Sequence, residues 1–215
     1  MNGELIEVLP PRSLQKYLGR KLCLHNGQQT EQNNRIASAW GAFHKHKGEL
    51  CSKNYCLADR IRLFEAVVSS TLLYGCASWA LTKRMEQRLQ TERRRMLRYV
   101  FCIHRRSSET WVEYMQRSAQ RIDEIAERFD MQTWLAACRR RKWRLEGAAV
   151  RATDGRWTQK ILSWRPSSEF QRHPGRPFTR WSDDLVSFAG GSWEETARQE
   201  SDWRCLEDGF VQQLV

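Results

Sequence analysis

The chain has 215 residues, of which 40% are hydrophobic, and it carries a formal net charge of +11 at pH 7. The hydrophobic fraction is enough to build a core, which excludes a chain that is disordered throughout. A charge this positive attracts polyanions, most commonly nucleic acid or an anionic membrane surface, although a basic balance can also serve solubility alone.

The sequence shows no signal for secretion or membrane insertion. Met1 is followed by Asn2, Gly3 and Glu4 instead of a basic and then an apolar segment. No run approaches the roughly twenty apolar residues that cross a bilayer. The seven cysteines are irregularly spaced and include no CxxC pair, which argues for reduced thiols and against a disulfide framework or a zinc ribbon. We therefore expect an intracellular protein, in the nucleus, the cytoplasm or both, with no membrane partner and no metal site.

The N-terminal segment predicts a β-hairpin. Two short apolar runs, about 5–9 and 17–24, are separated by Pro10 and Pro11, which disfavour a helix and favour a turn. Gly19 inside the second run indicates a bulge or a close approach of backbone.

Helical periodicity follows. Residues 30–48 predict a helix with Thr30 as its N-cap, and residues 57–74 predict one so apolar that it should be mostly buried. Thr82 can cap a third helix, about 83–102.

The third predicted helix has two contrasting faces. One is apolar, and the other is basic and carries Arg84, Arg88, Arg95 and Arg98. Only Glu86 and Glu92 are available to offset these arginines along the helix. The basic face is either a solvated surface or a surface that follows phosphates. We favour the second, because like charges on one helix repel each other unless a polyanion compensates them.

Two more helices are predicted, about 109–129 and 131–147. The second contains a basic cluster interrupted by one aromatic residue, a pattern that suits phosphate contacts combined with base stacking. A targeting patch, or core packing of the tryptophan, would explain the same residues. The cluster comprises Arg139, Arg140, Arg141, Lys142, Trp143 and Arg144.

The last part of the chain is rich in loops. Glycines and prolines interrupt any helical pattern from Gly147 to about Pro177, apart from a short helix or turn around Trp157. Ser182 is expected to cap a helix over 183–188, and a capping box at Ser192 should open a final helix to about residue 206. The fold class is therefore mainly α, with a short N-terminal β-hairpin, a helical bundle and a loop-rich helical tail.

Two motifs carry a resemblance to a known family. Residues 73–82 contain Tyr74-Gly75-Cys76 followed by Trp79, and residues 175–184 contain Gly-Arg-Pro followed by Arg-Trp-Ser-Asp-Asp. In this order and separation they resemble the region after the polymerase palm in reverse transcriptases of non-LTR, LINE-type retrotransposons. Weaker similarities to the same region lie in residues 16–19, 61–68, 88–98, 140–143 and 197–204, the last two with altered spacing.

The resemblance implies a three-part organisation. Residues 1–25 would be a palm-derived hairpin similar to the primer grip, residues 26–147 a thumb-like helical domain, and residues 148–215 a loop-rich basic tail. Such a chain would bind template–primer nucleic acid, RNA and DNA alike, through phosphates and without reading sequence. Its protein partner would be the upstream palm and fingers of a longer polyprotein.

Catalytic residues are not expected in this chain. Nucleotidyl transfer needs carboxylates that hold two metal ions, and the family's aromatic-Ala-Asp-Asp motif is not found here. Asp183-Asp184 follows a Gly/Pro-rich loop and is better explained as a helix N-terminus. We expect no metal site and no cofactor, since Mg²⁺ would belong to the missing palm, and no polymerase activity from the chain alone.

The resemblance and the charge pattern together give a set of expected nucleic-acid contacts. The hairpin residues would lie near the primer end, the basic residues on phosphates, and the two tryptophans against bases. The set is Tyr17, Leu18, Gly19, Arg84, Arg88, Arg95, Arg98, Arg105, Arg106, Arg139, Arg140, Arg141, Lys142, Trp143, Arg176, Arg180 and Trp181. Tyr74 and Trp79 are expected in the core. The alternatives are a free-standing nucleic-acid-binding module derived from such an element, or a helical interaction protein whose arginines only keep it in solution.

Overall fold

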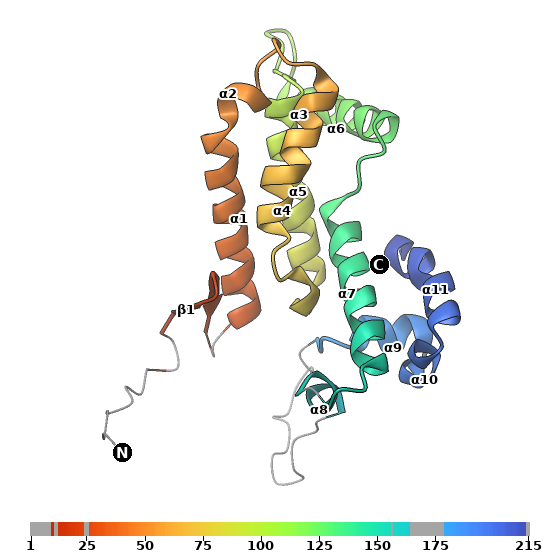
Figure 1. Ribbon diagram of the computed structural model, residues 1–215. Helices are drawn as coiled ribbons and strands as arrows, with labels where there is room; N and C mark the ends of the chain where they lie inside the picture. Colours follow the sequence, from red (N-terminus) through yellow and green to blue (C-terminus); the bar gives the residue numbers. More distant parts are fainter. Residues whose placement is uncertain (1–9, 11–12, 24–25, 156, 164–178, 214–215) are drawn as a thin grey trace. The chain divides into compact units, whose positions relative to one another are not determined.

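The computed structural model describes residues 10, 13–23, 26–155, 157–163 and 179–213 (Figure 1). The fold is mainly helical with a two-stranded antiparallel hairpin near the N-terminus, which confirms the predicted fold class. Within the described residues, no helix has the length and apolar character that crossing a membrane requires.

The chain divides into two compact units. Unit 1 comprises Met1–Tyr74 and Arg94–Ile122, and unit 2 comprises Gly75–Arg93 and Asp123–Val215. One division falls after Tyr74, and the other two fall inside the helices Lys83–Val100 and Trp111–Arg128. The longest helix that lies wholly in unit 2 is α7 (Trp134–Arg151).

The hairpin of unit 1 consists of β1 (Gln15–Tyr17) and β2 (Arg20–Leu22), with Tyr17 opposite Arg20. The two residues between the strands, Leu18 and Gly19, have φ values of 46° and 75°. Positive φ at both central positions is the signature of a type I′ turn, which matches the twist of a hairpin. Gly19 is thus a turn residue and not a bulge inside a strand. The first predicted strand, 5–9, lies outside the described residues.

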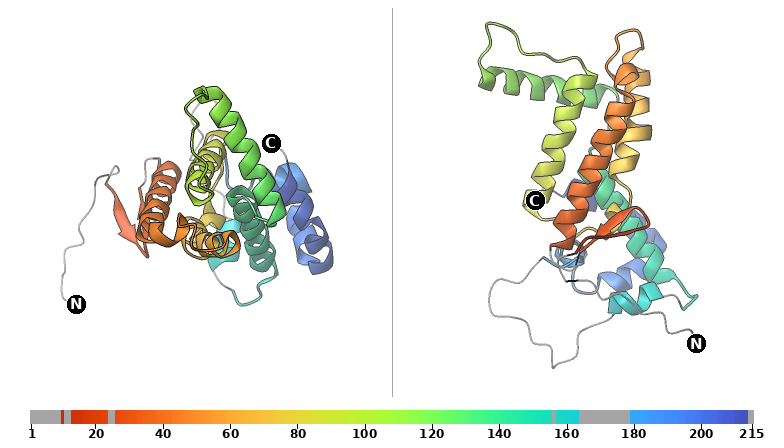
Figure 2. Two further views of the ribbon diagram at one scale, coloured as in Figure 1. Left: turned by 90° about the horizontal axis from the view of Figure 1, so that it is seen from above. Right: turned by 90° about the vertical axis from the view of Figure 1, so that its left-hand side faces the viewer.

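The first helices of unit 1 are α1 (Gly27–Lys45) and α2 (Lys47–Leu50). The prediction that Thr30 caps α1 is wrong, because the helix begins three residues earlier and the Thr30 N–H already donates to the Asn26 carbonyl at 3.0 Å. The hairpin packs on α1 through β2 (Figure 2).

The apolar helix expected over 57–74 is confirmed. It consists of α3 (Leu57–Leu63), the π-helical segment η1 (Phe64–Ser69) and α4 (Ser70–Leu72). Its apolar stripe is fully buried at Phe64 and Val68, so the segment forms the centre of unit 1.

The basic helix α5 (Lys83–Val100) begins as predicted, since the Thr82 hydroxyl accepts the N–H of Met85 at 3.3 Å. Its apolar face is buried, as expected, at Met85, Leu89, Met96 and Val100. The next helix, α6, spans Trp111–Arg128.

The remaining elements belong to unit 2. Neither Ser182 nor Ser192 makes the expected capping hydrogen bond, and the predicted last helix is interrupted at Gln199. Instead, the Asp183 carboxylate accepts the backbone N–H of Arg180 at 2.7 Å, and this hydrogen bond stabilises the start of the helix that begins at Asp183. The remaining elements of unit 2 are the 3₁₀ turn η2 (Cys76–Ser78), α8 (Trp157–Ser163), α9 (Asp183–Ala189), α10 (Trp193–Arg198) and α11 (Glu200–Gln212).

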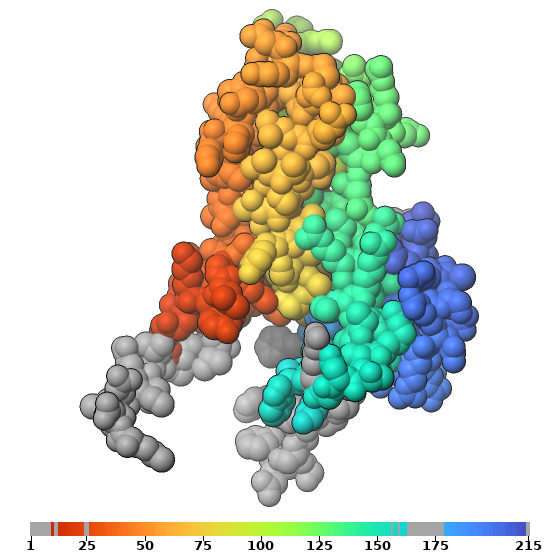
Figure 3. All heavy atoms as spheres, viewed as in Figure 1, coloured from red at the N-terminus to blue at the C-terminus, as the bar shows by residue number. Residues whose placement is uncertain are grey.

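Two stacked tryptophans form the core of unit 2. The rings of Trp143 on α7 and Trp203 on α11 are parallel within 4° and 3.6 Å apart between centroids. Each indole N–H donates to the backbone carbonyl of the other residue at 2.9 Å, so both polar atoms are satisfied within the core. A Cβ at Gly147 would lie 2.5 Å from the Trp203 ring, so only glycine fits there. Side chains of α11 cover this side of α7 (Figure 3).

Candidate nucleic-acid interface

The tip of the hairpin is exposed and held at several points. Tyr17 and Leu18 both face solvent. The Leu18 carbonyl accepts the Tyr74 hydroxyl at 3.0 Å, and the Gly19 carbonyl accepts the Arg35 guanidinium. Arg35 also lies 4.9 Å from the centre of the Tyr74 ring. The turn therefore presents its side chains from a fixed backbone.

These contacts correct the expectation that Tyr74 is a core residue. Its side chain is 48% exposed, and its hydroxyl anchors the hairpin. Trp79 is buried, as the sequence suggested. Tyr74 lies two residues after the end of α4, where its phenol can reach the hairpin backbone while its ring stays half exposed.

The basic face of α5 remains open. Arg84, Arg88 and Arg95 are exposed and Arg98 is half-buried. Among the described residues, none of these four arginines forms an ion pair with a carboxylate. Arg84 and Arg88 belong to unit 2, and Arg95 and Arg98 to unit 1. An anion that met any one of these arginines would therefore not have to displace a carboxylate of the described residues.

Arg105 and Arg106 lie in an ordered loop before α6. The Arg105 guanidinium donates to the Glu109 carbonyl at 2.9 Å, and the Arg106 N–H donates to the Glu109 carboxylate at 3.1 Å. Arg117 binds the same carboxylate at 2.6 Å, and this hydrogen bond is the main reason why the pKa of Glu109 is lowered to about 2. The loop thus keeps both arginine side chains exposed on a fixed backbone.

Two members of the basic cluster on α7 are core residues, which contradicts their predicted role. Trp143 has no exposed surface and is stacked on Trp203, so its ring has no free face for a base. Lys142 is 4% exposed, and its ammonium binds both oxygens of Asp184 at 2.7 and 2.8 Å. Burial lowers the pKa of Lys142, and the Asp184 carboxylate opposes that shift. Neither side chain can reach a polyanion.

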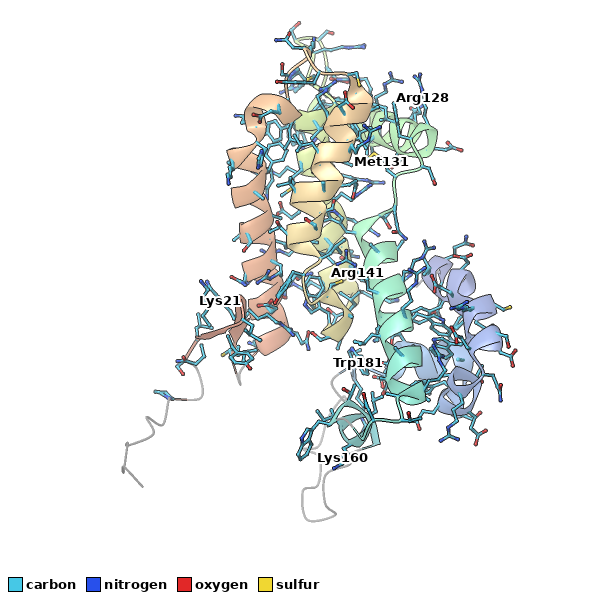
Figure 4. All side chains as sticks on the ribbon, viewed as in Figure 1. Lys21, Arg128, Met131, Arg141, Lys160 and Trp181 are labelled. Atoms are coloured by element: carbon cyan, nitrogen blue, oxygen red, sulfur yellow. The ribbon has the colours of Figure 1, made fainter. Side chains whose placement is uncertain are left out.

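Other arginines of α7 are neutralised from within unit 2. Arg139 binds Glu86 at 3.1 Å, and Arg140 binds Asp208 at 2.9 Å. Arg144 binds Glu207 at 2.7 Å. Arg141 is exposed (Figure 4). The pKa of the Cys76 thiol is lowered chiefly by a hydrogen bond from Cys138, and the guanidinium of Arg141 lowers it further. The cluster therefore joins α7 to its neighbours, mainly through carboxylates of α11.

The residues of the Gly-Arg-Pro motif are only partly described. Arg176 lies outside the described residues, and Arg180 is exposed. Trp181 is half-buried, since its indole N–H donates to the Ala77 carbonyl at 2.8 Å and Lys142 lies 5.1 Å from its ring centre (Figure 4). One face of this indole is thus occupied by the protein's own lysine.

The acidic pair in that motif has structural contacts. Asp184 binds Lys142, and Asp183 accepts the Arg180 N–H. In the part of the chain that is described, no group of three or more His, Cys, Asp or Glu side chains could hold a metal ion. All seven cysteines are free thiols.

Unit 1 has a second basic surface that no local sequence pattern indicates. Side chains of α1, α2 and the C-terminal half of α5 line a hollow of about 320 Å³ in unit 1. Its lining combines aromatic rings with cations, and only Arg95 was a predicted contact. The lining residues are Trp40, Phe43, His44, Lys47, Arg95 and Tyr99.

Comparisons with known proteins give one significant similarity. The chain is 29% identical over 199 residues to an uncharacterised transposon-derived protein of Caenorhabditis elegans, a match that covers 87% of this chain and 67% of that protein. No protein-family model matches the chain, and no solved structure gives a significant match. The similarity supports a transposon-related origin for this chain.

Proposed function

We propose that this chain is the non-catalytic C-terminal part of a non-LTR retrotransposon reverse transcriptase, and that it holds template–primer nucleic acid by its phosphates. The observation that carries the proposal is the face of α5, where four arginines lie without carboxylate partners among the described residues. The similarity to a transposon-derived protein supports the origin. The resemblance of the 73–82 and 175–184 motifs supports the assignment to this region of the enzyme.

The contacts that the proposal uses are fewer than the sequence suggested. Arg139, Arg140, Lys142 and Trp143 are engaged inside unit 2 and drop out of the contact set. Phosphate contacts position a nucleic acid without reading its bases, so binding should be insensitive to sequence. The residues proposed to remain are Tyr17, Leu18, Gly19, Arg84, Arg88, Arg95, Arg98, Arg105, Arg106, Arg141, Arg176, Arg180 and Trp181.

Salt dependence tests the proposal directly. Binding of the purified chain to a labelled RNA–DNA hybrid should weaken linearly in a plot of log affinity against log salt, with a slope of about 0.9 for each phosphate neutralised on a duplex. The variant Arg88→Gln/Arg95→Gln/Arg98→Gln should bind more weakly and with a shallower slope for every sequence tried.

A matched control separates local contacts from net charge. Arg62, Arg144 and Arg204 are each paired with a carboxylate, at 3.1, 2.7 and 2.5 Å. Replacing these three by Gln removes the same charge from arginines that are already neutralised. Equal losses in the two triple variants would mean that the α5 face is not the contact surface.

The neutralised cluster on α7 favours one other candidate, a helical interaction module derived from such an element. Its cations would serve to join helices, and it would have no affinity for polyanions. A flat salt response, or no binding at low salt, would support that candidate instead.

A further inference from the structure

The hollow between α1, α2 and α5 has the size of a small-ligand site. Its volume is about 320 Å³, near the lower end of the roughly 300–1,000 Å³ of ligand pockets. It lies wholly within unit 1, since its residues fall in 40–47 and 95–99. A volume of this size suits a single base with part of its backbone and excludes a long segment of duplex.

The rings around the hollow are held in place by one another. Tyr99 meets Trp40 nearly edge-on, with centroids 6.4 Å apart and planes at 81°. Phe43 is buried 6.1 Å behind Tyr99. Tyr99 nevertheless remains 45% exposed, so part of its ring is open to solvent. A fixed and half-exposed aromatic ring is a platform on which a base can stack.

The same hollow is positively charged. The guanidinium of Arg95 lies 5.2 Å from the centre of the Trp40 ring. Lys47, on α2, also lines the hollow. No carboxylate is among the described residues that line it. Cations beside an aromatic platform match the two chemical parts of a nucleotide, its phosphate and its base.

We propose that this hollow binds one unpaired nucleotide of a single-stranded segment, with the base on Tyr99 and the adjoining phosphate on Lys47 and Arg95. The inference rests on the proposed function and specifies what unit 1 does beyond holding duplex phosphates. Bases within a duplex are stacked and paired, so only an unpaired nucleotide has a free face to offer. A single-stranded template next to the duplex supplies such nucleotides.

The first test needs no variant. The wild-type chain is titrated with a labelled single-stranded oligonucleotide and with one of equal length whose central bases are replaced by abasic sites. Phosphates are identical in the two strands, so the difference reports contacts with the bases and not with the backbone charge. We expect the abasic strand to bind about tenfold more weakly, within the range measured for base–aromatic stacking.

The second test assigns the platform. Tyr99→Ala should weaken binding to the normal single strand about tenfold, leave the abasic strand unchanged and leave blunt duplex unchanged. Tyr55→Ala is the matched control, because Tyr55 is 51% exposed and does not line the hollow. Lys47→Gln should reduce the slope of log affinity against log salt for the single strand by about 0.7.

The outcomes separate the two proposals. Equal affinity of the wild type for normal and abasic strands overturns the inference, whether or not Tyr99→Ala folds, while salt-dependent duplex binding leaves the proposed function standing. A loss of single-strand binding in Tyr55→Ala equal to that in Tyr99→Ala would also overturn it, because the hollow would not be the site. If the wild type binds no nucleic acid at low salt, both proposals fail.

Discussion

Replacing Gly147 by alanine should destabilise unit 2, although the same change usually stabilises a helix. Within a helix, alanine is favoured over glycine by about 0.8–1.0 kcal/mol. At this position, however, the new Cβ would lie 2.5 Å from Cδ1 and Nε1 of Trp203 and 2.9 Å from the Arg151 guanidinium. Something must therefore move to make room for a single methyl group.

The tryptophan cannot move cheaply. Its ring is stacked 3.6 Å from that of Trp143, and the two indoles exchange hydrogen bonds with each other's backbone. Overpacking a well-packed core costs about 1–3 kcal/mol. An approach of 2.5 Å to a fixed ring belongs in the upper part of that range, about 2–3 kcal/mol. After the gain of about 1 kcal/mol in helix propensity, we expect Gly147→Ala to lower the free energy of unfolding by about 1–2 kcal/mol.

Gly41→Ala is the matched control. Gly41 also lies inside a long helix, α1, but a Cβ there would meet no atom within 4 Å. This variant should gain about 0.5–1 kcal/mol. Urea denaturation followed by far-UV circular dichroism measures both changes. If Gly147→Ala proves as stable as the wild type or more stable, the close packing of α7 on α11 is not as described.

Three further perturbations have expected outcomes. Asp184→Asn should lower the free energy of unfolding by about 1–3 kcal/mol, because it removes the carboxylate from the buried ammonium of Lys142. Replacing both residues, as Lys142→Met with Asp184→Asn, should recover much of that loss in the same urea titration. Glu146 is fully buried with neither carboxylate oxygen hydrogen bonded, and burial raises its pKa from 4.5 to about 8. Because the carboxyl group ionises at lower pH in the unfolded chain, the free energy of unfolding should fall as the pH rises from about 4.5 to 8. Glu146→Gln should remove that part of the fall, and parallel curves of unfolding free energy against pH for the two proteins would contradict the assignment. Tyr74→Phe removes the 3.0 Å hydrogen bond to Leu18, so amide exchange in the hairpin should quicken by the equivalent of about 1 kcal/mol while the global melting of the chain stays unchanged.

The sequence predicts elements well where local pattern decides them. The apolar stripe of 57–74 and the alternating faces of α5 depend on neighbours three and four residues away, and the Thr82 cap depends on a partner three residues away. Helix ends were less predictable. Thr30, Ser182 and Ser192 all have capping chemistry, yet none of these three side chains caps its helix.

Pairings between distant segments could not be predicted from local pattern. Trp143 and Trp203 are 60 residues apart, and Arg140 and Asp208 are 68 residues apart. A window of sequence around 139–144 therefore shows only unopposed cations. The hollow at Tyr99 was missed for the same reason, since it combines residues 40–47 with 95–99 and no motif links them.

The distribution of carboxylates, more than the number of cations, indicates where a polyanion can bind. The net charge of +11 does not distinguish α5 from α7, because both helices are rich in arginine. On α7, acidic residues of α9 and α11 neutralise the positive charge, and a polyanion would have to displace buried or bidentate pairs to reach it. On α5, ionic contact with a phosphate requires only the release of counterions and solvent. The free energy of binding should therefore come from α5 and the hollow beside it, and arginine substitutions on α7 should change stability before they change affinity.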